Sequence, residues 1–264
     1  MPVNDELGKR MKEYYESIPK TKLMRRTPVA IRIDGKAFHT FTKGFQKPFD
    51  EVLINSMQRT MKHLCENIQG CVLGYAQSDE ITLILVDYKN LNSDAWFDYE
   101  VQKMCSIAAS MATMAFNNYF YDEVMNWYGR VEKNSENNKM FSNYCIKVSI
   151  GAMFDARVFN IPKEEVTNLV YWRQLDATRN SIQMVGQANF SHKELQNKSC
   201  NVIQDMLMTE KGINWNDYPT YQKRGSCCIK ECYPESVRSH WVIDKEIPVF
   251  KGEDREYIEK LINF

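Results

Sequence analysis

The stretch that decides the fold is Val29-Ala30-Ile31-Arg32-Ile33-Asp34-Gly35, taken together with residues 71–86, which read CVLGYAQSDEITLILV. The first segment alternates apolar and polar residues and then meets a glycine, which predicts a strand that ends at a turn. In the second segment, the polar residues 77–80 separate two apolar runs, which predicts a β-hairpin. The two segments therefore predict three strands of one sheet.

Helical periodicity on both sides of the hairpin extends this pattern. Asp50 is a plausible N-cap, and apolar residues follow it at spacings of three and four over residues 53–68. After the hairpin, residues 96–120 repeat apolar side chains at helical spacing. A polar loop is predicted over residues 131–140 and a further strand over residues 144–153. The order strand, helix, strand, strand, helix, strand is the split βαβ, ferredoxin-like arrangement.

The segments that flank this pattern are predicted to pack on it. Residues 4–18 read as a polar amphipathic helix. Four elements are expected in the C-terminal half: helices over residues 162–185 and 202–208, and short strands near residues 228–230 and 241–243. No flexible linker separates the halves. The sequence therefore predicts an α+β chain with a core over residues 1–153 and a helical C-terminal extension over residues 154–264, packed as a single structural unit.

The composition is that of an ordinary globular protein, with 44% hydrophobic and 26% charged residues. The sequence has no run of 18 apolar residues, and its charged start, MPVNDELGKRMKEYY, lacks the apolar core of a signal peptide. Eight scattered cysteines without a Cys-x-x-Cys pair are expected to be free thiols. We therefore expect a cytoplasmic protein with no membrane partner. Because 34 basic and 34 acidic residues balance, any RNA site must be a local patch.

Two acidic residues fall where this topology brings strand ends together. Asp34 ends the first strand, and Asp79 lies in the hairpin turn beside Glu80. The first strand of a split βαβ sheet lies beside the third, so Asp34 and Asp79 can converge on one site. Carboxylate oxygens suit magnesium, and two such ions assist phosphoryl transfer. Each residue alone is also consistent with ordinary turn chemistry. Glu80 should point to the opposite face from Asp79, which predicts a supporting role.

At this point the chain resembles the tRNA-His guanylyltransferase-like family of 3′–5′ polymerases, over nearly its whole length. The matching segments, in order, are Arg32-Ile33-Asp34-Gly35-Lys36-Ala37-Phe38-His39, Lys47-Pro48 with Asp50, Gly74-Tyr75-Ala76-Gln77-Ser78-Asp79-Glu80, Phe154-Asp155-Ala156-Arg157-Val158, Trp172-Arg173-Gln174 with Asp176, and Lys223-Arg224-Gly225-Ser226. The resemblance implies a polymerase palm with a helical C-terminal extension. The implied reaction is activation of an RNA 5′-phosphate by a nucleoside triphosphate, attack by the 3′-hydroxyl of an incoming nucleotide, and release of pyrophosphate.

The resemblance also implies roles for individual residues. The implied ligands of two Mg²⁺ ions are Asp34, the backbone carbonyl of Gly35, and Asp79, with Glu80 beside them in the catalytic centre. The implied nucleotide site comprises Gly35, Lys36, Ala37, Phe38, His39, Lys47, Ser78 and Lys103. Backbone N–H groups of such a turn can cradle a triphosphate. GTP and ATP are the implied substrates, and the implied partner is tRNA, bound by a homotetramer.

Four members of the nucleotide site have an ordinary alternative. Lys47 and Lys103 are equally compatible with solvated surface lysines, and His39 with a hydrogen-bonded turn histidine. Phe38 is expected to belong to the core rather than to stack on a base.

The chain departs from the family pattern in two places. Enzymes that add a guanylate to tRNA-His carry His-Ile-Asn-Asn after the Trp-Arg-Gln segment, and this chain has Thr178-Arg179-Asn180-Ser181. Two family arginines are replaced by Tyr99 and Glu100. These changes favour the bacterial-type relatives, which resemble template-dependent polymerases that repair truncated tRNA 5′ ends. Arg157, Arg179 and Asn180 are the candidates for RNA contacts.

Other functions stay open at this level. A nucleotide cyclase or cyclic-nucleotide synthase also uses a βαββαβ palm with two carboxylates, although such synthases usually carry Gly-Gly-Asp/Glu-Glu-Phe where this chain has residues 77–81. A non-catalytic RNA-binding module would display several aromatic residues on its central strands, which here offer only Tyr75. A zinc site is a further alternative. Its candidate ligands, Cys227, Cys228, Cys232 and His240, form an incomplete signature, so buried free thiols are expected.

Overall fold

A six-stranded antiparallel sheet in the order β4-β1-β3-β2-β5-β6 forms the centre of the chain. The computed structural model describes residues 5–232 and 239–263. The strands are β1 (Val29–Gly35), β2 (Cys71–Gln77), β3 (Glu80–Leu85), β4 (Phe154–Asn160), β5 (Ser226–Cys232) and β6 (Ser239–Asp244). The first four strands have the order and directions of a ferredoxin-like sheet, which confirms the predicted fold class.

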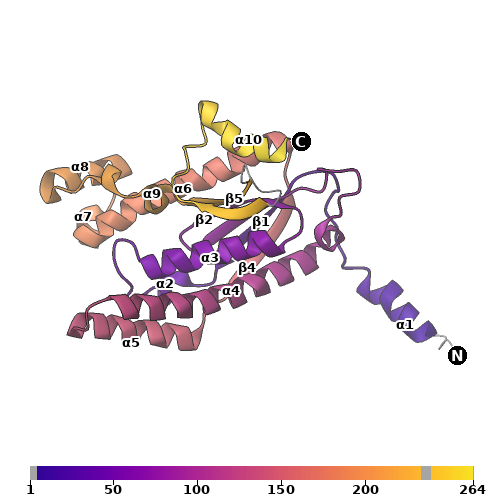
Figure 1. The fold of residues 1–264 in the computed structure, drawn as a ribbon, viewed down its shortest axis with the longest axis horizontal. Coiled ribbons are helices and arrows are strands. Elements are labelled where there is room, and N and C mark those ends of the chain that lie inside the picture. The colour runs from indigo at the N-terminus through magenta and orange to yellow at the C-terminus, as the bar shows by residue number, and fades with distance from the viewer. Residues whose placement is uncertain (1–4, 233–238, 264) are drawn as a thin grey trace.

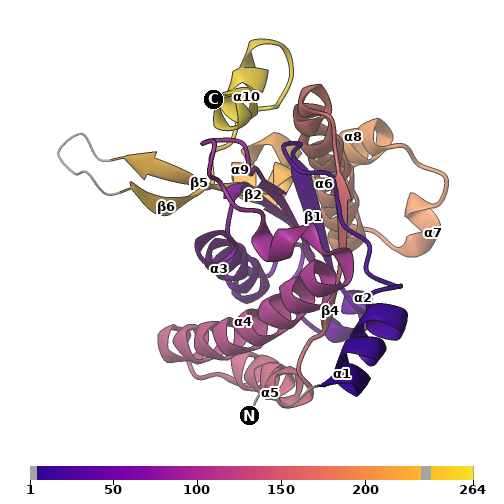
Figure 2. The ribbon, with the colours of Figure 1, turned by 90° about the vertical axis from the view of Figure 1, so that its right-hand side faces the viewer.

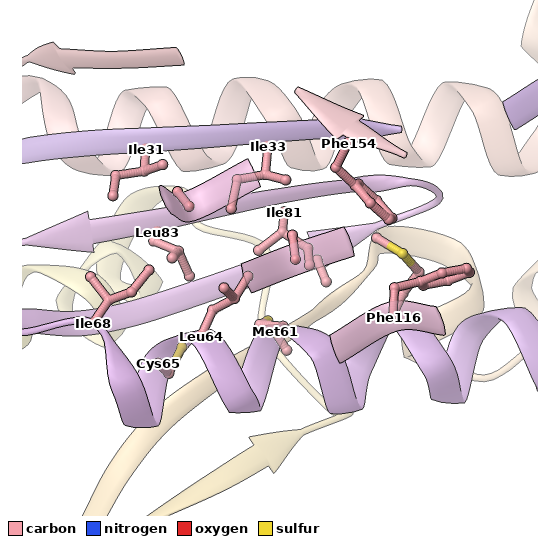
Figure 3. Packing of buried hydrophobic residues seen from close by; sticks show 14 of the residues in the cluster. Ile31, Ile33, Met61, Leu64, Cys65, Ile68, Ile81, Leu83, Phe116 and Phe154 are labelled. Atoms are coloured by element: carbon pink, nitrogen blue, oxygen red, sulfur yellow. The ribbon is translucent and has the colours of Figure 1, made fainter. Parts of the chain in front are cut away.

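One face of this sheet is covered by the helices α3 (Glu51–Asn67) and α4 (Val101–Arg130) (Figure 1). Asp50 caps α3 as predicted, because its side chain accepts a hydrogen bond from the N–H of Leu53 at 2.9 Å. Figure 3 shows the resulting core, in which isoleucines and leucines of β1 and β3 meet the apolar stripe of α3. The spacing of that stripe in the sequence therefore identified the helix correctly.

The predicted strand over residues 144–153 is wrong, and so is the second half of the predicted loop. The helix α5 (Ser135–Ile150) occupies both, and β4 follows it. The Asn134 side chain caps α5 by accepting from the N–H of Asn137 at 2.8 Å, and Gly151 ends it with a φ of 74°. Tyr144 is buried against Trp127 of α4, so a contact with another helix holds this segment in place. The fourth strand of the palm consequently lies in the segment first assigned to the extension.

The other face of the sheet is covered by α6 (Val166–Asn189) and α10 (Glu256–Ile262), as Figures 1 and 2 show. Their apolar residues pack with Ala30 and Ile84 in a second core cluster. The remaining helical segments are α2 (Phe38–Phe41), α7 (His192–Leu195), α8 (Cys200–Lys211), α9 (Thr220–Arg224) and short 3₁₀ turns at Trp96–Tyr99, Lys163–Glu165, Trp215–Asp217 and Gly252–Arg255. The two predicted C-terminal strands are β5 and β6, which extend the palm sheet beyond β2.

The first helical segment stands apart from this body. It comprises α1 (Glu6–Met11) and a π-helical continuation over Lys12–Glu16, none of whose residues is buried (Figure 1). Among the described residues, no helix combines the length and apolar character that a membrane crossing requires.

Candidate active site

The ends of β1 and β3 bring two carboxylates together, at the end of the sheet where the β2–β3 hairpin turns. The N–H of Gly35 donates to the backbone carbonyl of Asp79 at 3.1 Å, which ties the end of β1 to the hairpin turn. Burial raises the pKa of Asp79, the Ser78 hydroxyl at 2.9 Å lowers it, and the negative charge of Asp34 raises it further. Two residues far apart in the sequence therefore form one acidic centre.

Glu80 lies beside this centre but is already paired. It is the register partner of Asp34, so both side chains lie on the α6 face of the sheet. Its carboxylate accepts from Arg173 Nε at 2.6 Å, and Arg32 Nε lies 3.8 Å from its other oxygen. Burial raises the pKa of Glu80, while the charge of Arg173 and then that of Arg32 lower it. Glu80 therefore acts here as a buried anion that fixes two arginines next to Asp34.

A cavity of about 710 Å³ opens beside Asp79. Its walls include five members of the predicted nucleotide turn and hairpin, together with a loop lysine and two α6 residues: Gly35, Ala37, Phe38, His39, Ser78, Lys47, Met184 and Gln187. Ala37 and Ser78 have φ values of 54° and 51°, a left-handed conformation in which successive N–H groups can converge on an anion. Only glycine fits at position 35, because a Cβ there would lie 2.2 Å from the Phe38 ring.

The cavity wall is held by Asp50. Besides capping α3, its carboxylate accepts from the N–H of Gln46 at 2.9 Å and from the Tyr144 hydroxyl at 2.5 Å. Asp50 thus joins α5 and the loop before α3 at the rim of the cavity. Phe38 is only 4% exposed and packs on Phe41, so it is a core residue whose edge reaches the cavity.

The structure does not bring every predicted residue to this cavity. Lys36 donates its N–H to the carbonyl of Met153 and is not part of the lining. Lys103 lies near the start of α4, with its Nζ 4.8 Å from the centre of the Phe97 ring. Thr113 of α4 contacts the Asp34 end of the sheet, where its hydroxyl accepts a hydrogen bond from the N–H of Phe154. Ten helical residues, or about 15 Å, separate it from Lys103.

The three predicted RNA-contact residues lie on the α6 side of the sheet. Arg157 is exposed on β4, with Asp155 3.8 Å away. Arg179 and Asn180 both donate to Asp176, which also accepts from Arg173. None of the three lines the cavity beside Asp79.

Residues 172–181 form contacts that the motif match does not predict. In the sequence, Arg173 is only one residue of a matching segment. Its ion pair with Glu80 spans 93 residues, so no local pattern predicts it. Gln174 donates to the carbonyl of Pro248 and accepts from the N–H of Phe250, which fixes the tail. Ser181, where the family asparagine is missing, accepts from the Trp215 indole at 3.1 Å.

The residues at the carboxylate pair suit a hard cation. The donors available are oxygens, from Asp34, Asp79 and the Gly35 backbone. The described residues contain no group of three or more His, Cys, Asp or Glu side chains arranged to hold a metal, so an ion here would also need backbone, water or phosphate oxygens. Magnesium binds in that way. The zinc alternative does not assemble, since Cys227 and Cys228 face opposite sides of β5.

The sheet order and the acidic centre at its end define a ferredoxin-like palm. The family model described as tRNAHis guanylyltransferase matches residues 8–162. A bacterial tRNA(His) guanylyltransferase (Thg1)-like protein solved in complex with ATP is 44% identical, with a TM-score of 0.82 and coverage of 97% of this chain and 98% of that one. A second such structure, in complex with GTP, is 40% identical with a TM-score of 0.79, covering 98% and 100%.

A curated relative, the tRNA(His) guanylyltransferase of Schizosaccharomyces pombe, is 26% identical over 223 residues, which is 80% of this chain and 76% of that protein. The chain belongs to the tRNAHis guanylyltransferase family, a family of nucleotidyltransferases.

Proposed function

We propose that this protein is a magnesium-dependent polymerase that adds nucleotides to the 5′ end of tRNA in the 3′–5′ direction and copies a template strand. The observation that carries the proposal is the pairing of Asp34 with Asp79, because Asp79 lines the cavity together with Gly35, Ala37, Phe38 and His39 of the adjoining turn. The site offers acidic oxygens for cations and, immediately beside them, backbone N–H groups for phosphates.

The nucleotide substrates we propose are ATP and GTP. Two relatives of 44% and 40% identity were solved in complex with ATP and GTP respectively. A cavity of about 710 Å³ has the size of a small-molecule site. In this proposal the N–H groups of Ala37, Phe38 and His39 receive the triphosphate, and Lys47 neutralises part of its charge.

The residues that would hold magnesium are Asp34, Asp79 and the Gly35 carbonyl. When bound, two such ions would neutralise the phosphates and favour attack by a hydroxyl oxygen at neutral pH. Other groups of this chain hold the two carboxylates in position. The hydrogen bond from Gly35 to the Asp79 backbone keeps the two carboxylates in register, and Ser78 orients the Asp79 carboxylate. Arg173 pairs with the Glu80 carboxylate, which leaves the other two carboxylates for the cations.

The proposed reaction has two phosphoryl transfers at one site. In the first, an oxygen of the RNA 5′-phosphate attacks the α-phosphorus of the activating triphosphate, and pyrophosphate leaves. In the second, the 3′-hydroxyl of the incoming nucleotide attacks the 5′-phosphorus of the RNA, gives up its proton, and the activating nucleoside monophosphate leaves. Because both attacks occur at a phosphorus bearing negative oxygens, charge neutralisation and alignment are the main requirements.

We prefer template-dependent repair to dedicated guanylylation because residues 178–181 lack the pattern of enzymes that add a guanylate to tRNA-His. Here the Ser181 hydroxyl accepts a hydrogen bond from the Trp215 indole and donates one to the carbonyl of Lys223. Assembly as a homotetramer and a cytoplasmic location remain predictions of the same proposal.

The test is incorporation of labelled nucleotides into tRNAs that lack their first nucleotides, with the opposing 3′-strand nucleotide varied. The proposal predicts that the added nucleotide follows the template and that EDTA abolishes addition. Addition of guanylate whatever the template would instead indicate a dedicated guanylyltransferase. A parallel incubation with nucleotide alone tests for cyclic products, whose formation would favour a cyclase.

A further inference from the structure

A large aromatic side chain remains exposed next to the acidic centre. Trp172 of α6 is 52% exposed, although tryptophan is among the most costly residues to leave in water. Its ring lies 4.6 Å from the guanidinium carbon of Arg173 and 5.9 Å from that of Arg32. Both arginines pair with Glu80, Arg173 at 2.6 Å and Arg32 at 3.8 Å, so the ring lies beside two guanidinium groups that share one carboxylate.

The path of α6 places this ring on the far side of the reacting centre from the nucleotide cavity. Met184 lines the cavity, Arg173 is bonded to Glu80 opposite Asp34, and Trp172 adjoins Arg32. Twelve helical residues, about 18 Å, separate Trp172 from Met184. Arg32 and Asp34 are two residues apart on one strand, about 7 Å. The acidic centre therefore lies between the cavity and the ring.

Positive groups continue from the ring towards the edge of the sheet. Arg157 on β4 is the register partner of Arg32, so both side chains lie on the same face; the Arg157 side chain is 58% exposed, with Asp155 3.8 Å away. An exposed aromatic ring with arginines beside it is the combination with which proteins bind single-stranded nucleic acid, by stacking on bases and neutralising phosphates. Because the chain as a whole is neutral, such a local strip is where RNA affinity can reside.

We propose that Trp172 is the stacking platform for the 5′-terminal base of the RNA that is being extended, with Arg32 and Arg157 facing its phosphates. This inference rests on the proposed function and assigns the RNA side of the same site. With the incoming nucleotide in the cavity, the 5′-phosphate of the RNA lies at Asp34 and Asp79, and its base lies on the Trp172 side.

The test compares the RNA affinities of protein variants for two hairpins, and it needs no catalysis. The full-length protein, without nucleotide or magnesium, is titrated into a 3′-labelled acceptor-stem hairpin carrying a 5′-monophosphate, and into the same hairpin with an abasic 5′-terminal residue. For the wild type, loss of the base weakens binding by roughly 5- to 150-fold, the range set by one base stacked on one aromatic ring. Trp172→Ala weakens binding of the intact hairpin by the same factor and no longer distinguishes the two RNAs, whereas Trp172→Phe keeps most of the preference.

Leu175→Ala is the matched control, because Leu175 is 49% exposed on the same helix. It should bind both hairpins like the wild type. Equal effects of Trp172→Ala and Leu175→Ala, an unchanged base preference in Trp172→Ala, or no binding by the wild type would each overturn the inference. A lower assembly mass for Trp172→Ala in light scattering would overturn it too, by assigning the ring to a subunit contact. Base-dependent binding by a wild type that adds no nucleotide would refute the proposed function and would retain only the stacking of the RNA 5′-terminal base on Trp172.

Discussion

Replacing Arg173 by methionine removes the cation that faces the buried Glu80 carboxylate and keeps most of the side-chain volume. Glu80 is 6% exposed and Arg173 is 8% exposed, and their closest atoms are 2.6 Å apart. After the substitution, Glu80 keeps only Arg32, at 3.8 Å. Asp176 loses one donor but retains Arg179 and Asn180.

The size of the effect follows from these contacts. Removing one partner of a buried ion pair typically costs 3–5 kcal/mol, because the other charge is left without compensation. The remaining Arg32 offsets part of this, so we expect Arg173→Met to lower the free energy of unfolding by about 2–4 kcal/mol. At roughly 2–4 °C per kcal/mol for a domain of this size, the melting temperature should fall by about 5–15 °C.

The assay is urea unfolding of wild type, Arg173→Met, Glu80→Gln and the double variant, at equal protein concentration. If the two side chains act as a pair, Arg173→Met costs about 2 kcal/mol less in the Glu80→Gln background than in the wild type. Equal costs in both backgrounds would refute the reasoning, since Arg173 would then stabilise the fold without involving Glu80.

Three further predictions concern the cavity wall, the tail and the lysines. Asp50→Ala should destabilise the fold by about 2–4 kcal/mol, since it removes a helix cap and leaves the Tyr144 hydroxyl unpaired; Tyr144→Phe should cost less, and equal losses in urea unfolding would contradict this assignment. Gln174→Ala should cost about 1–3 kcal/mol and speed hydrogen exchange over residues 248–262; unchanged exchange there would be the contrary result. Lys47→Ala should raise the KM for triphosphate by roughly tenfold in a nucleotide-addition assay, because one charged contact is lost. Lys103→Ala should leave this KM within twofold. Similar effects of the two substitutions would contradict the placement of Lys103 outside the cavity.

The parts of the fold that the sequence predicted are those with short-range signals. β1 ends at Gly35, the hairpin turns at residues 77–80, and α3 starts at its Asp50 cap. The helix α5 was not predicted because its apolar residues do not show one clear period, and its stability depends on contacts with other elements. Tyr144, for example, packs on Trp127 of α4 with ring centres 5.3 Å apart. Such tertiary contacts override local propensity.

The contacts of the site also fall into those that the sequence predicts and those that it does not. Strand order alone gave a reason for Asp34 and Asp79 to meet, because pairing of β1 with β3 is a rule of this topology. The ion pair between Glu80 and Arg173 depends on how α6 docks on the sheet, which no local pattern encodes. For Lys103 the motif match predicted a position in the site, but the match does not show which end of a helix lies near the site. The structure places Lys103 beside Phe97, near the start of α4.

The central claim is that Asp34 and Asp79 hold the cations for nucleotide addition. Its most direct test is a magnesium titration of nucleotide addition to a 5′-truncated tRNA by wild type, Asp34→Asn and Asp79→Asn, with melting temperatures recorded alongside. We predict that each variant remains folded, melts within a few degrees of the wild type, and loses at least about a hundredfold of its activity at every magnesium concentration, as expected when one preorganised charge is lost from a reacting centre. Wild-type activity and an unchanged magnesium dependence in either folded variant would contradict the claim.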